Sequence, residues 1–217
     1  MRVEAIIFDM DGLLINSEPL WREAEKKVFG QLGLTLNEEE LRATTGIRLD
    51  EVVRIRYAQK PWNDLSLRET EAVITEEVIS GINRGIPLLP GVQQVLDQVN
   101  SSGLPCAIAS SSPLSIINAA VKYFSWQTLI PIIQSAEGLE LGKPHPEVYI
   151  NAAASLKTPP NKCLAFEDSI PGVIAAKAAQ MITVAVPDHE FRGHPGFGIA
   201  DLTLKTIEEF KLEDWLK

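Results

Sequence analysis

Five short apolar runs, separated by segments with helical spacing, constrain the fold of this chain more than any other feature. The runs are rich in β-branched residues and do not alternate between apolar and polar positions, which is typical of strands covered on both faces. Strands that alternate with helices form a parallel sheet with right-handed crossovers. We therefore expect an α/β fold with a doubly wound parallel sheet, its strands lying in Val3–Phe8, Leu104–Ser110, Ile130–Ala136, Lys162–Asp168 and Met181–Pro187.

The segment from residue 17 to residue 87 interrupts this rhythm, because it contains helical patterns and no good strand. We expect it to form an all-helical cap domain inserted into a Rossmann-like core that consists of residues 1–16 and 88–217. A last weak strand is expected around Ala200–Leu204, and a closing helix from Thr206 to Leu216. The 217 residues are enough for a core that folds without disulfide bonds.

Polar residues follow four of the expected strands at the points where these strands end. They are Asp9 and Asp11 after the first strand, Ser110–Ser112 after the second, Lys143 after the third, and Glu167 with Asp168 after the fourth. Doubly wound sheets bind ligands beyond the carboxyl ends of their strands. We therefore expect the four clusters to meet at one edge of the sheet.

The two carboxylates after the first strand fit covalent phosphoryl transfer. Asp9 is placed to attack phosphorus and form an aspartyl-phosphate, a form of nucleophilic catalysis. Asp11 is placed to protonate the leaving oxygen and then to activate water, so it has to hold a proton at neutral pH in the first step.

The surplus of negative charge at this edge predicts a hard cation. Asp168, Asp9 and backbone oxygens form the sparse oxygen set that Mg²⁺ prefers, and Mn²⁺ or Co²⁺ are expected as substitutes. Lys143 offers a positive charge to the transferring group. The hydroxyl of Ser110 and the backbone amide of Ser111 suit a phosphate oxygen.

Each cluster also has an ordinary structural interpretation. The stretch from Asp9 to Gly12 is compatible with a simple turn or a fragment of a calcium loop, and the serines are compatible with a helix N-cap. Lys143 is compatible with a solvated loop, and Glu167 and Asp168 with a cap for the helix that follows. All four clusters occur in order at the ends of separately inferred strands, and this combination favours the catalytic interpretation.

The four motifs, "FDMDGLL", "IASSS", "GKPHPEVY" and "FEDSIPG", resemble those of the haloacid dehalogenase superfamily, and the helical insert resembles the cap of its β-phosphoglucomutase-like group. An acid at position 11 is typical of the phosphatase and mutase branches. The resemblance implies Asp9 as nucleophile and Asp11 as acid and base. The metal ligands that it implies are Asp9, Asp11, Glu167 and Asp168, and the phosphate-binding residues are Asp9, Met10, Asp11, Ser110, Ser111 and Lys143.

The cap stretch "GIRLDEVVRIRYAQKPWN" is similar to that of bacterial 2-deoxyglucose-6-phosphate and hexitol-phosphate phosphatases. Glu18 and Arg48 are candidates to face the core and bind substrate, although an arginine at the start of a helix is more often solvated, and we favour the solvated state for Arg48. Trp21 and Trp62 can stack on a sugar, yet helical spacing favours a place for Trp21 in the core of the cap.

Two positions depart from the family pattern. Asn16 stands where the first motif commonly has Asp, at the hinge into the cap, and we expect it to alter cap closure more than chemistry. Gln180 replaces a glycine that suits a left-handed helix end, so we expect either a different turn or a small strain there.

These motifs predict a Mg²⁺-dependent phosphatase that hydrolyses small sugar phosphates or sugar-alcohol phosphates through an aspartyl-phosphate. A β-phosphoglucomutase-like phosphomutase is the alternative, because the same two carboxylates serve both reactions and four cap arginines (Arg42, Arg48, Arg54 and Arg56) are available for a second phosphate. A non-enzymatic binding protein is disfavoured, because it would be expected to have lost at least one catalytic residue.

The composition bounds the partners and the location. The 20 Lys and Arg residues against 29 Asp and Glu residues give a net charge of −9, which disfavours nucleic acid and anionic membranes as partners. Cys106 and Cys163 lie in apolar runs, so a disulfide is not expected. No leader and no membrane-spanning run is visible. We expect a cytoplasmic monomer that acts on a small-molecule sugar phosphate.

Overall fold

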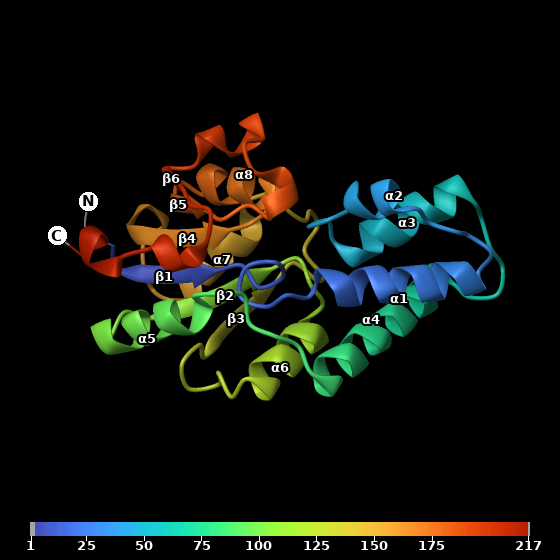
Figure 1. Ribbon diagram of the computed structural model, residues 1–217, viewed down its shortest axis with the longest axis horizontal. Helices are drawn as coiled ribbons and strands as arrows, with labels where there is room; N and C mark the ends of the chain where they lie inside the picture. The colour runs from blue at the N-terminus through green and yellow to red at the C-terminus, as the bar shows by residue number, and fades with distance from the viewer. Residues whose placement is uncertain (1–2, 217) are drawn as a thin grey trace.

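The computed structural model describes residues 3–216 and contains a six-stranded sheet in the order β3-β2-β1-β4-β5-β6 (Figure 1). Every neighbouring pair of strands is parallel. The strands are β1 (Ala5–Phe8), β2 (Cys106–Ser110), β3 (Ile132–Ser135), β4 (Cys163–Glu167), β5 (Ile182–Ala185) and β6 (Leu202–Thr203). The doubly wound parallel sheet is confirmed, and the strand order reverses between β1 and β4, where such sheets form a binding crevice.

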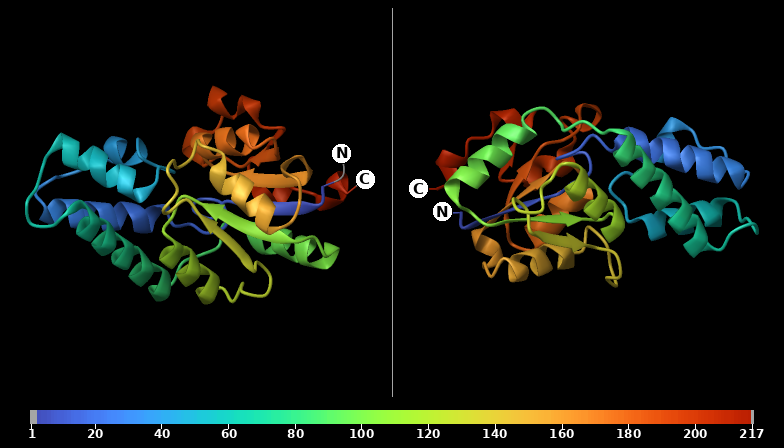
Figure 2. Two further views of the ribbon diagram at one scale, coloured as in Figure 1. Left: turned by 180° about the vertical axis from the view of Figure 1, so that it is seen from behind. Right: turned by 90° about the horizontal axis from the view of Figure 1, so that it is seen from below.

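Both faces of the sheet are buried, as the lack of alternation in the strands predicts. On one face, Ile6 and Phe8 of β1 pack with α5 (Val92–Ser102) and α6 (Leu114–Tyr123). On the other face, Ala5 and Ile7 pack with α7 (Glu147–Ser155) and α8 (Ile170–Ala178). Figure 2 shows the helices on the two sides of the sheet. This packing fixes β1, and with it the position of the carboxylates that follow.

Residues 18–84 form four helices and no strand, and they lie beyond the carboxyl ends of the sheet strands (Figure 1). The helices are α1 (Glu18–Gln31), α2 (Glu38–Arg42), α3 (Leu49–Gln59) and α4 (Leu67–Arg84). Capping boxes at Asn37 and Ser66 begin α2 and α4. Trp62 is buried against Phe29 and Tyr57, so it stabilises this helical unit and does not face a substrate.

The helical unit is connected to the sheet by two segments that lie side by side. The N–H of Asn16 donates to the carbonyl of Pro87 at 3.1 Å, and Ile15 forms an isolated antiparallel bridge with Leu88. We propose that these segments are the hinge of a cap made of residues 17–87 on a core made of residues 1–16 and 88–217. The effect of Asn16 on closure stays a prediction.

The closing helix expected from Thr206 to Leu216 is wrong. Two short 3₁₀ segments, η4 (Ile207–Glu209) and η5 (Leu212–Trp215), take its place. The buried residues there are Ile207, Phe210 and Leu212, and a spacing of three and then two residues does not form one face of an α-helix. The other 3₁₀ segments are η1 (Pro160–Lys162), η2 (His189–Phe191) and η3 (Pro195–Ile199).

The end of α8 is formed by Gln180 in the left-handed conformation, with φ of 65°. Its N–H donates to the carbonyl of Lys177 at 2.9 Å. The chain therefore keeps the turn that glycine favours, and the side chain makes this conformation less favourable by about 1 kcal/mol. Of the two expectations for this position, the small strain is the one that the structure adopts.

Cys106 and Cys163 are buried free thiols, in agreement with the expectation of no disulfide. Burial raises the pKa of Cys106 to about 11 and that of Cys163 to about 12, so neither thiol is activated for chemistry. Among the described residues, no helix combines the length and the apolar character needed to cross a membrane.

Candidate active site

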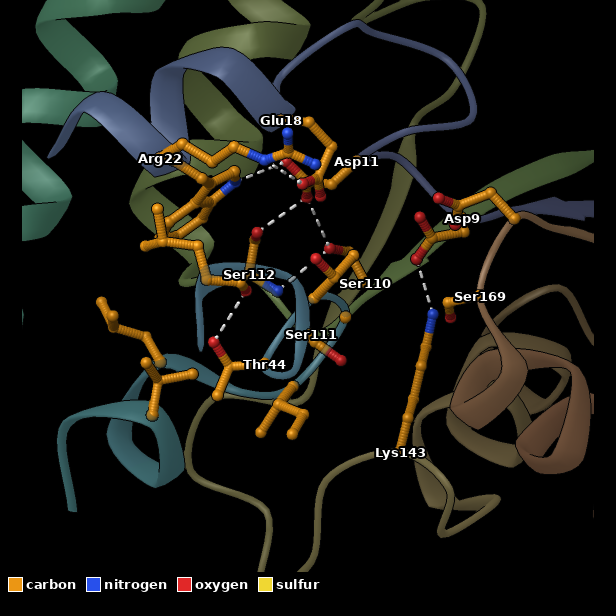
Figure 3. Close-up of a pocket in the computed structure, with 18 of the residues that line it drawn as sticks. Asp9, Asp11, Glu18, Arg22, Thr44, Ser110, Ser111, Ser112, Lys143 and Ser169 are labelled. Carbon is orange, nitrogen blue, oxygen red and sulfur yellow. Dashed lines mark hydrogen bonds and ion pairs between the residues drawn. The ribbon is translucent and has the colours of Figure 1, made fainter. Parts of the chain in front are cut away.

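A cavity lies between the carboxyl ends of the central strands and the helical cap (Figure 3). Its core side is lined by Asp9, Asp11, Ser110, Ser111, Ser112, Lys143 and Asp168, and its cap side includes Glu18, Trp21, Arg22, Glu25, Thr44 and Thr45. The structure therefore brings the four polar clusters to one edge of the sheet. In Figure 3, Lys143 reaches Asp9 from one side, and Glu18 and Arg22 lie beside Asp11 on the other.

Lys143 is the centre of a buried ionic network. Its Nζ lies 2.6 Å from Oδ1 of Asp9 and 2.6 Å from Oε1 of Glu167, and it also donates to the carbonyl of Ala109 at 3.0 Å. The hydroxyl of Tyr149 donates to the same oxygen of Glu167 at 2.6 Å. The sequence interpretation missed Tyr149, although it lies within the third motif, six residues after the lysine.

The charges in this network shift one another's ionisation. Burial raises the pKa of Asp9 to about 8, and the positive charge of Lys143 opposes this rise. For Lys143, burial disfavours the charged form, but the carboxylates of Asp9 and Glu167 outweigh it and raise its pKa. Lys143 is therefore a permanent cation beside the candidate nucleophile.

Asp11 is held by four hydrogen bonds to its carboxyl group. Oδ1 accepts from the hydroxyl of Ser17 at 2.7 Å and from Nε1 of Trp21 at 3.0 Å. Oδ2 accepts from Ser112 at 2.7 Å and from Ser110 at 3.3 Å. Three of these partners are hydroxyl groups, which can donate or accept, so the network accommodates Asp11 with or without a proton. This suits a residue that serves as acid and then as base.

The contacts of Ser17, Trp21 and Ser112 with Asp11 were not predicted from the sequence. Ser112 was grouped with the other serines, but nothing in its spacing singles it out. Trp21 was expected in the core of the cap, and it does pack against the buried cluster. It also lines the cavity, which was not expected. These contacts depend on how the start of α1 lies over the strand ends, which the sequence pattern does not define.

The residues present fit a divalent metal ion. Asp9, Glu167 and Asp168 each offer a carboxylate oxygen, and these atoms lie within 4.8 Å of one another in a buried cluster. Gly12 has φ of 78°, and a Cβ built on it would come within 2.2 Å of Oδ2 of Asp168, so glycine leaves room for this carboxylate. Burial, followed by the neighbouring charge of Asp9, raises the pKa of Asp168. Such an oxygen-rich site favours Mg²⁺.

Glu167 has a different place in this cluster. Its Oε1 accepts from Lys143 and Tyr149, and its Oε2 accepts from the N–H groups of Asp168 and Ser169 and from the Ser169 hydroxyl. Both oxygens are thus engaged with donors, and we infer that Glu167 positions Lys143. Metal ligation by Glu167 stays a prediction, as does ligation by Asp11, whose carboxylate is bound to hydroxyl groups.

Two predicted substrate-binding residues do not line the cavity. Met10 is buried in the core, and its part in phosphate binding stays a prediction. Arg48 is only 10% exposed in its side chain, so the expected solvated state is wrong. It donates to the carbonyls of Ala136 and Leu139 at 3.2 and 2.7 Å, which joins the cap to the core outside the cavity.

Glu18 does line the cavity, at the start of α1, and pairs with Arg22 over 3.7 Å. Burial raises its pKa, while the charge of Arg22 opposes this rise. Contact between Glu18 and a substrate stays a prediction.

A family model described as haloacid dehalogenase-like hydrolase matches residues 6–186. The chain belongs to this hydrolase family, which confirms the resemblance drawn from the four motifs. Among the relatives, hexitol phosphatase B of Escherichia coli (strain K12) is 41% identical over 216 residues, which make up 99% of this chain and 97% of that protein.

Two solved structures share the fold. CbbY from Rhodobacter sphaeroides in complex with xylulose-(1,5)bisphosphate has a TM-score of 0.88 and 27% identity, covering 95% of this chain and 96% of that one. β-Phosphoglucomutase from Clostridium difficile has a TM-score of 0.85 and covers 98% of this chain and 95% of that one, and its 22% identity makes it a comparison of fold alone.

Proposed function

We propose that the chain is a Mg²⁺-dependent phosphatase for small sugar phosphates or sugar-alcohol phosphates, such as 2-deoxyglucose-6-phosphate and hexitol phosphates. The observation that carries this proposal is the buried pair of Asp9 and Lys143 beside the hydrogen-bonded carboxyl group of Asp11. The chain is a phosphatase of the hydrolase family that it matches. Its substrate, its metal ion and its mechanism are the parts that we propose.

The proposed mechanism uses side chains that line the cavity. The phosphoryl group binds between Lys143, Ser110 and the backbone amide of Ser111, where the lysine neutralises part of its charge. Asp9 attacks phosphorus in line, and Asp11 donates a proton to the departing sugar oxygen. Asp11 then takes a proton from water, and the hydroxide cleaves the aspartyl-phosphate, which releases phosphate and restores Asp9.

Asp9 and Asp168 are the residues that we propose to hold Mg²⁺, with Mn²⁺ or Co²⁺ as substitutes. A divalent cation at these carboxylates supplies charge neutralisation to the nucleophile and the phosphoryl group. Because burial raises the pKa of Asp9 to about 8, Asp9 needs more positive charge nearby than Lys143 alone provides to be fully ionised at neutral pH.

The cap is closed over the cavity, which has a volume of about 60 Å³. This is below the roughly 300 Å³ at which ordinary ligand pockets begin, so a sugar phosphate has to enter with the cap open or displaced. Arg48 bonds to the core on one side of the cavity, and Arg42 pairs with Glu190 of the core at 2.8 Å elsewhere on the rim. These contacts have to break and re-form in each turnover.

The cap side of the cavity favours a phosphatase over a phosphomutase. A mutase has to hold a second phosphate, which calls for cations in the cap, yet the four arginines considered for this role (Arg42, Arg48, Arg54 and Arg56) do not line the cavity. All four are engaged elsewhere. Arg42 pairs with Glu190, and both Arg48 and Arg54 pair with Asp50. Arg56 donates to the Glu40 carbonyl and the Thr44 hydroxyl. The charged cap residues at the cavity are Arg22, Glu18 and Glu25, and their balance is unfavourable to a second dianion.

The decisive experiment measures phosphate release from a panel of hexose and hexitol phosphates, with Mg²⁺ and with a chelator. We expect release that requires the metal and is strongest for 2-deoxyglucose-6-phosphate or a hexitol phosphate. Isomerisation primed by a sugar bisphosphate, with little phosphate release, would establish the mutase instead. The monomeric state, the cytoplasmic location and the absence of nucleic acid or membrane partners stay predictions.

The covalent mechanism is tested by Asp9→Asn, which removes the nucleophile while keeping the side-chain shape. We expect turnover to fall by at least about 10⁴-fold. Asp97→Asn makes the same chemical change at an exposed position on α5 and should retain activity. Hydrolysis by Asp9→Asn at the normal rate would rule out the aspartyl-phosphate.

A further inference from the structure

Unpaired polar atoms are concentrated at the candidate active site. Five buried side-chain nitrogen or oxygen atoms lack a hydrogen-bond partner among residues 3–216, and three of them belong to residues that line this cavity. These three are Nε of Arg22, Oε2 of Glu25 and Oγ of Ser111. Nε of Arg22 lies 3.7 Å from Oε2 of Glu18, which is close enough for an ion pair and too far for a hydrogen bond. Because buried polar groups are nearly always paired in native proteins, with protein or with ordered water, this concentration indicates that water or a bound ligand in the cavity supplies the missing partners.

Of these three residues, Glu25 is the one whose missing partner is hardest to explain. It is 8% exposed and lies on α1, on the cap side. Burial raises its pKa to about 7, and the positive charge of Arg56 opposes this rise. Arg56 itself donates to the carbonyl of Glu40 and the hydroxyl of Thr44. No cation among the described residues lies within 4.0 Å of the Glu25 carboxylate, so an ion pair in the cap does not explain its burial.

The placement of Glu25 points to the end of the substrate that is remote from phosphorus. Glu18, Arg22 and Glu25 follow one another at intervals of four and three residues, so they lie on one face of α1. Seven residues of α-helix rise about 10 Å, and Glu18 is the end of this row that interacts with Asp11. Glu25 therefore lies at the far end of a polar row that begins beside the phosphoryl site.

We propose that Glu25 and Arg22 bind hydroxyl groups at the end of a neutral polyol chain distal to the phosphate, and that Glu25 thereby determines substrate specificity. A hydroxyl group donates and accepts, so one such group, or two adjacent ones, can pair both the carboxylate oxygen and the guanidinium N–H. A phosphate has no proton to donate as a dianion and is repelled by Glu18 and Glu25. This inference rests on the proposed phosphatase function and specifies the part of the substrate that the cap recognises.

The test compares two phosphate esters of different polyol length, hexitol 6-phosphate and glycerol 3-phosphate, in the presence of Mg²⁺. The quantity measured is the ratio of kcat/KM for the hexitol ester to that for the glycerol ester. Glu25→Ala is expected to lower this ratio by about 10-fold to 100-fold, because a hydrogen bond to a charged group is lost in the hexitol complex. Glu25→Gln keeps the shape of the side chain and one acceptor oxygen, so it should lower the ratio by less than Glu25→Ala does.

Glu23→Gln is the matched control, since Glu23 lies on the same helix two residues away and is exposed. Damage to the cap lowers kcat/KM for both esters together, so a ratio that stays at the wild-type value in both Glu25 variants would overturn the inference. A wild-type enzyme that hydrolyses both esters equally well would overturn it too, while leaving the phosphatase function intact. Release of phosphate from neither ester, nor from the wider panel, would overturn the proposed function itself.

If Glu25→Ala does not fold, binding can be measured without turnover in the Asp9→Asn background. Hexitol 6-phosphate is expected to bind at least about fivefold more weakly when Glu25→Gln is added to Asp9→Asn. Equal affinity of the two proteins would contradict a contact between Glu25 and the polyol.

Discussion

The two sides of the cavity satisfy their polar groups in opposite ways. On the core side, Lys143, Asp9 and Glu167 pair with one another, and the carboxyl group of Asp11 has four donors. On the cap side, the buried atoms Nε of Arg22 and Oε2 of Glu25 have no hydrogen-bond partner among the described residues. These charged groups of the core side are thus paired before a ligand arrives, and Oγ of Ser111 is the only buried side-chain atom described there that lacks a partner. On the cap side, a cation and a carboxylate each keep an unpaired buried atom.

Under the proposed function, this difference reflects what each side has to recognise. The phosphoryl group is the same in every substrate of the class, so its site can be fixed in advance, and fixed charges cost no reorganisation during the reaction. The polyol differs from one substrate to another. A cap that leaves polar atoms unpaired is less stable alone, and it gains the missing hydrogen bonds only with a ligand that presents hydroxyl groups at the right place.

The largest expected effect lies on the core side, in Lys143→Met. This change leaves Asp9 and Glu167 buried without their shared counter-charge, and breaking a buried ion pair from one side costs about 3–5 kcal/mol. We expect that loss in the free energy of unfolding, measured with urea at pH 7 in the presence of a chelator. Lys122→Met, at an exposed position on α6, should change stability by no more than about 0.5 kcal/mol.

A loss below about 1 kcal/mol in Lys143→Met would show that the core side does not depend on this pair. The contrast between paired charges on the core side and unpaired ones on the cap side would then fail.

An intermediate effect is expected on the cap side, in Glu25→Gln. The pKa of Glu25 is raised from 4.5 to about 7, mainly by burial. Between these values the folded protein binds more protons than the unfolded chain, so the raised pKa makes stability fall as pH rises through this window. The glutamine in Glu25→Gln does not titrate. The free energy of unfolding of this variant should therefore exceed that of the wild type by up to about 3 kcal/mol at pH 8, with little difference near pH 4.

Urea unfolding at several pH values measures this difference, with Glu23→Gln as the control that should follow the wild type. A difference that is constant from pH 4 to pH 8 would mean that Glu25 titrates normally. Burial of the Glu25 carboxylate would then not lower the free energy of unfolding at high pH.

The smallest effects are expected where the two sides touch. Arg48 is mostly buried and bonds to two core carbonyls, so Arg48→Gln should raise KM about 3-fold to 10-fold by weakening closure. The pair of Arg42 and Glu190 is more exposed, and exposed ion pairs contribute about 0–1 kcal/mol. Arg42→Gln should therefore change KM by less than about twofold. Steady-state kinetics that rank the two variants in the reverse order would assign the main closing contact to Arg42.

The same contrast explains which parts of the site could be predicted from the sequence. The core residues follow directly from the ends of β1, β2 and β4, because a parallel sheet brings its carboxyl ends to one edge. The contact of Trp21 with Asp11 and the place of Glu25 depend on the angle at which α1 lies over that edge, which helical periodicity does not define. The arginines also show what the sequence pattern does not define, because both Arg48 and Arg56 were candidates to bind a second phosphate. Arg48 instead donates to a backbone carbonyl of the core, and Arg56 to one of the cap.

The shape of the hinge has a consequence for how such a chain can change over evolution. Because Asn16 is hydrogen-bonded to Pro87, the chain leaves the sheet and returns to it at nearly the same point. A different helical segment with equally close ends can be inserted there without disturbing the register of any strand. If the cap determines specificity, as we propose, a graft of residues 17–87 from a relative should transfer substrate preference while the recipient keeps its own chemistry.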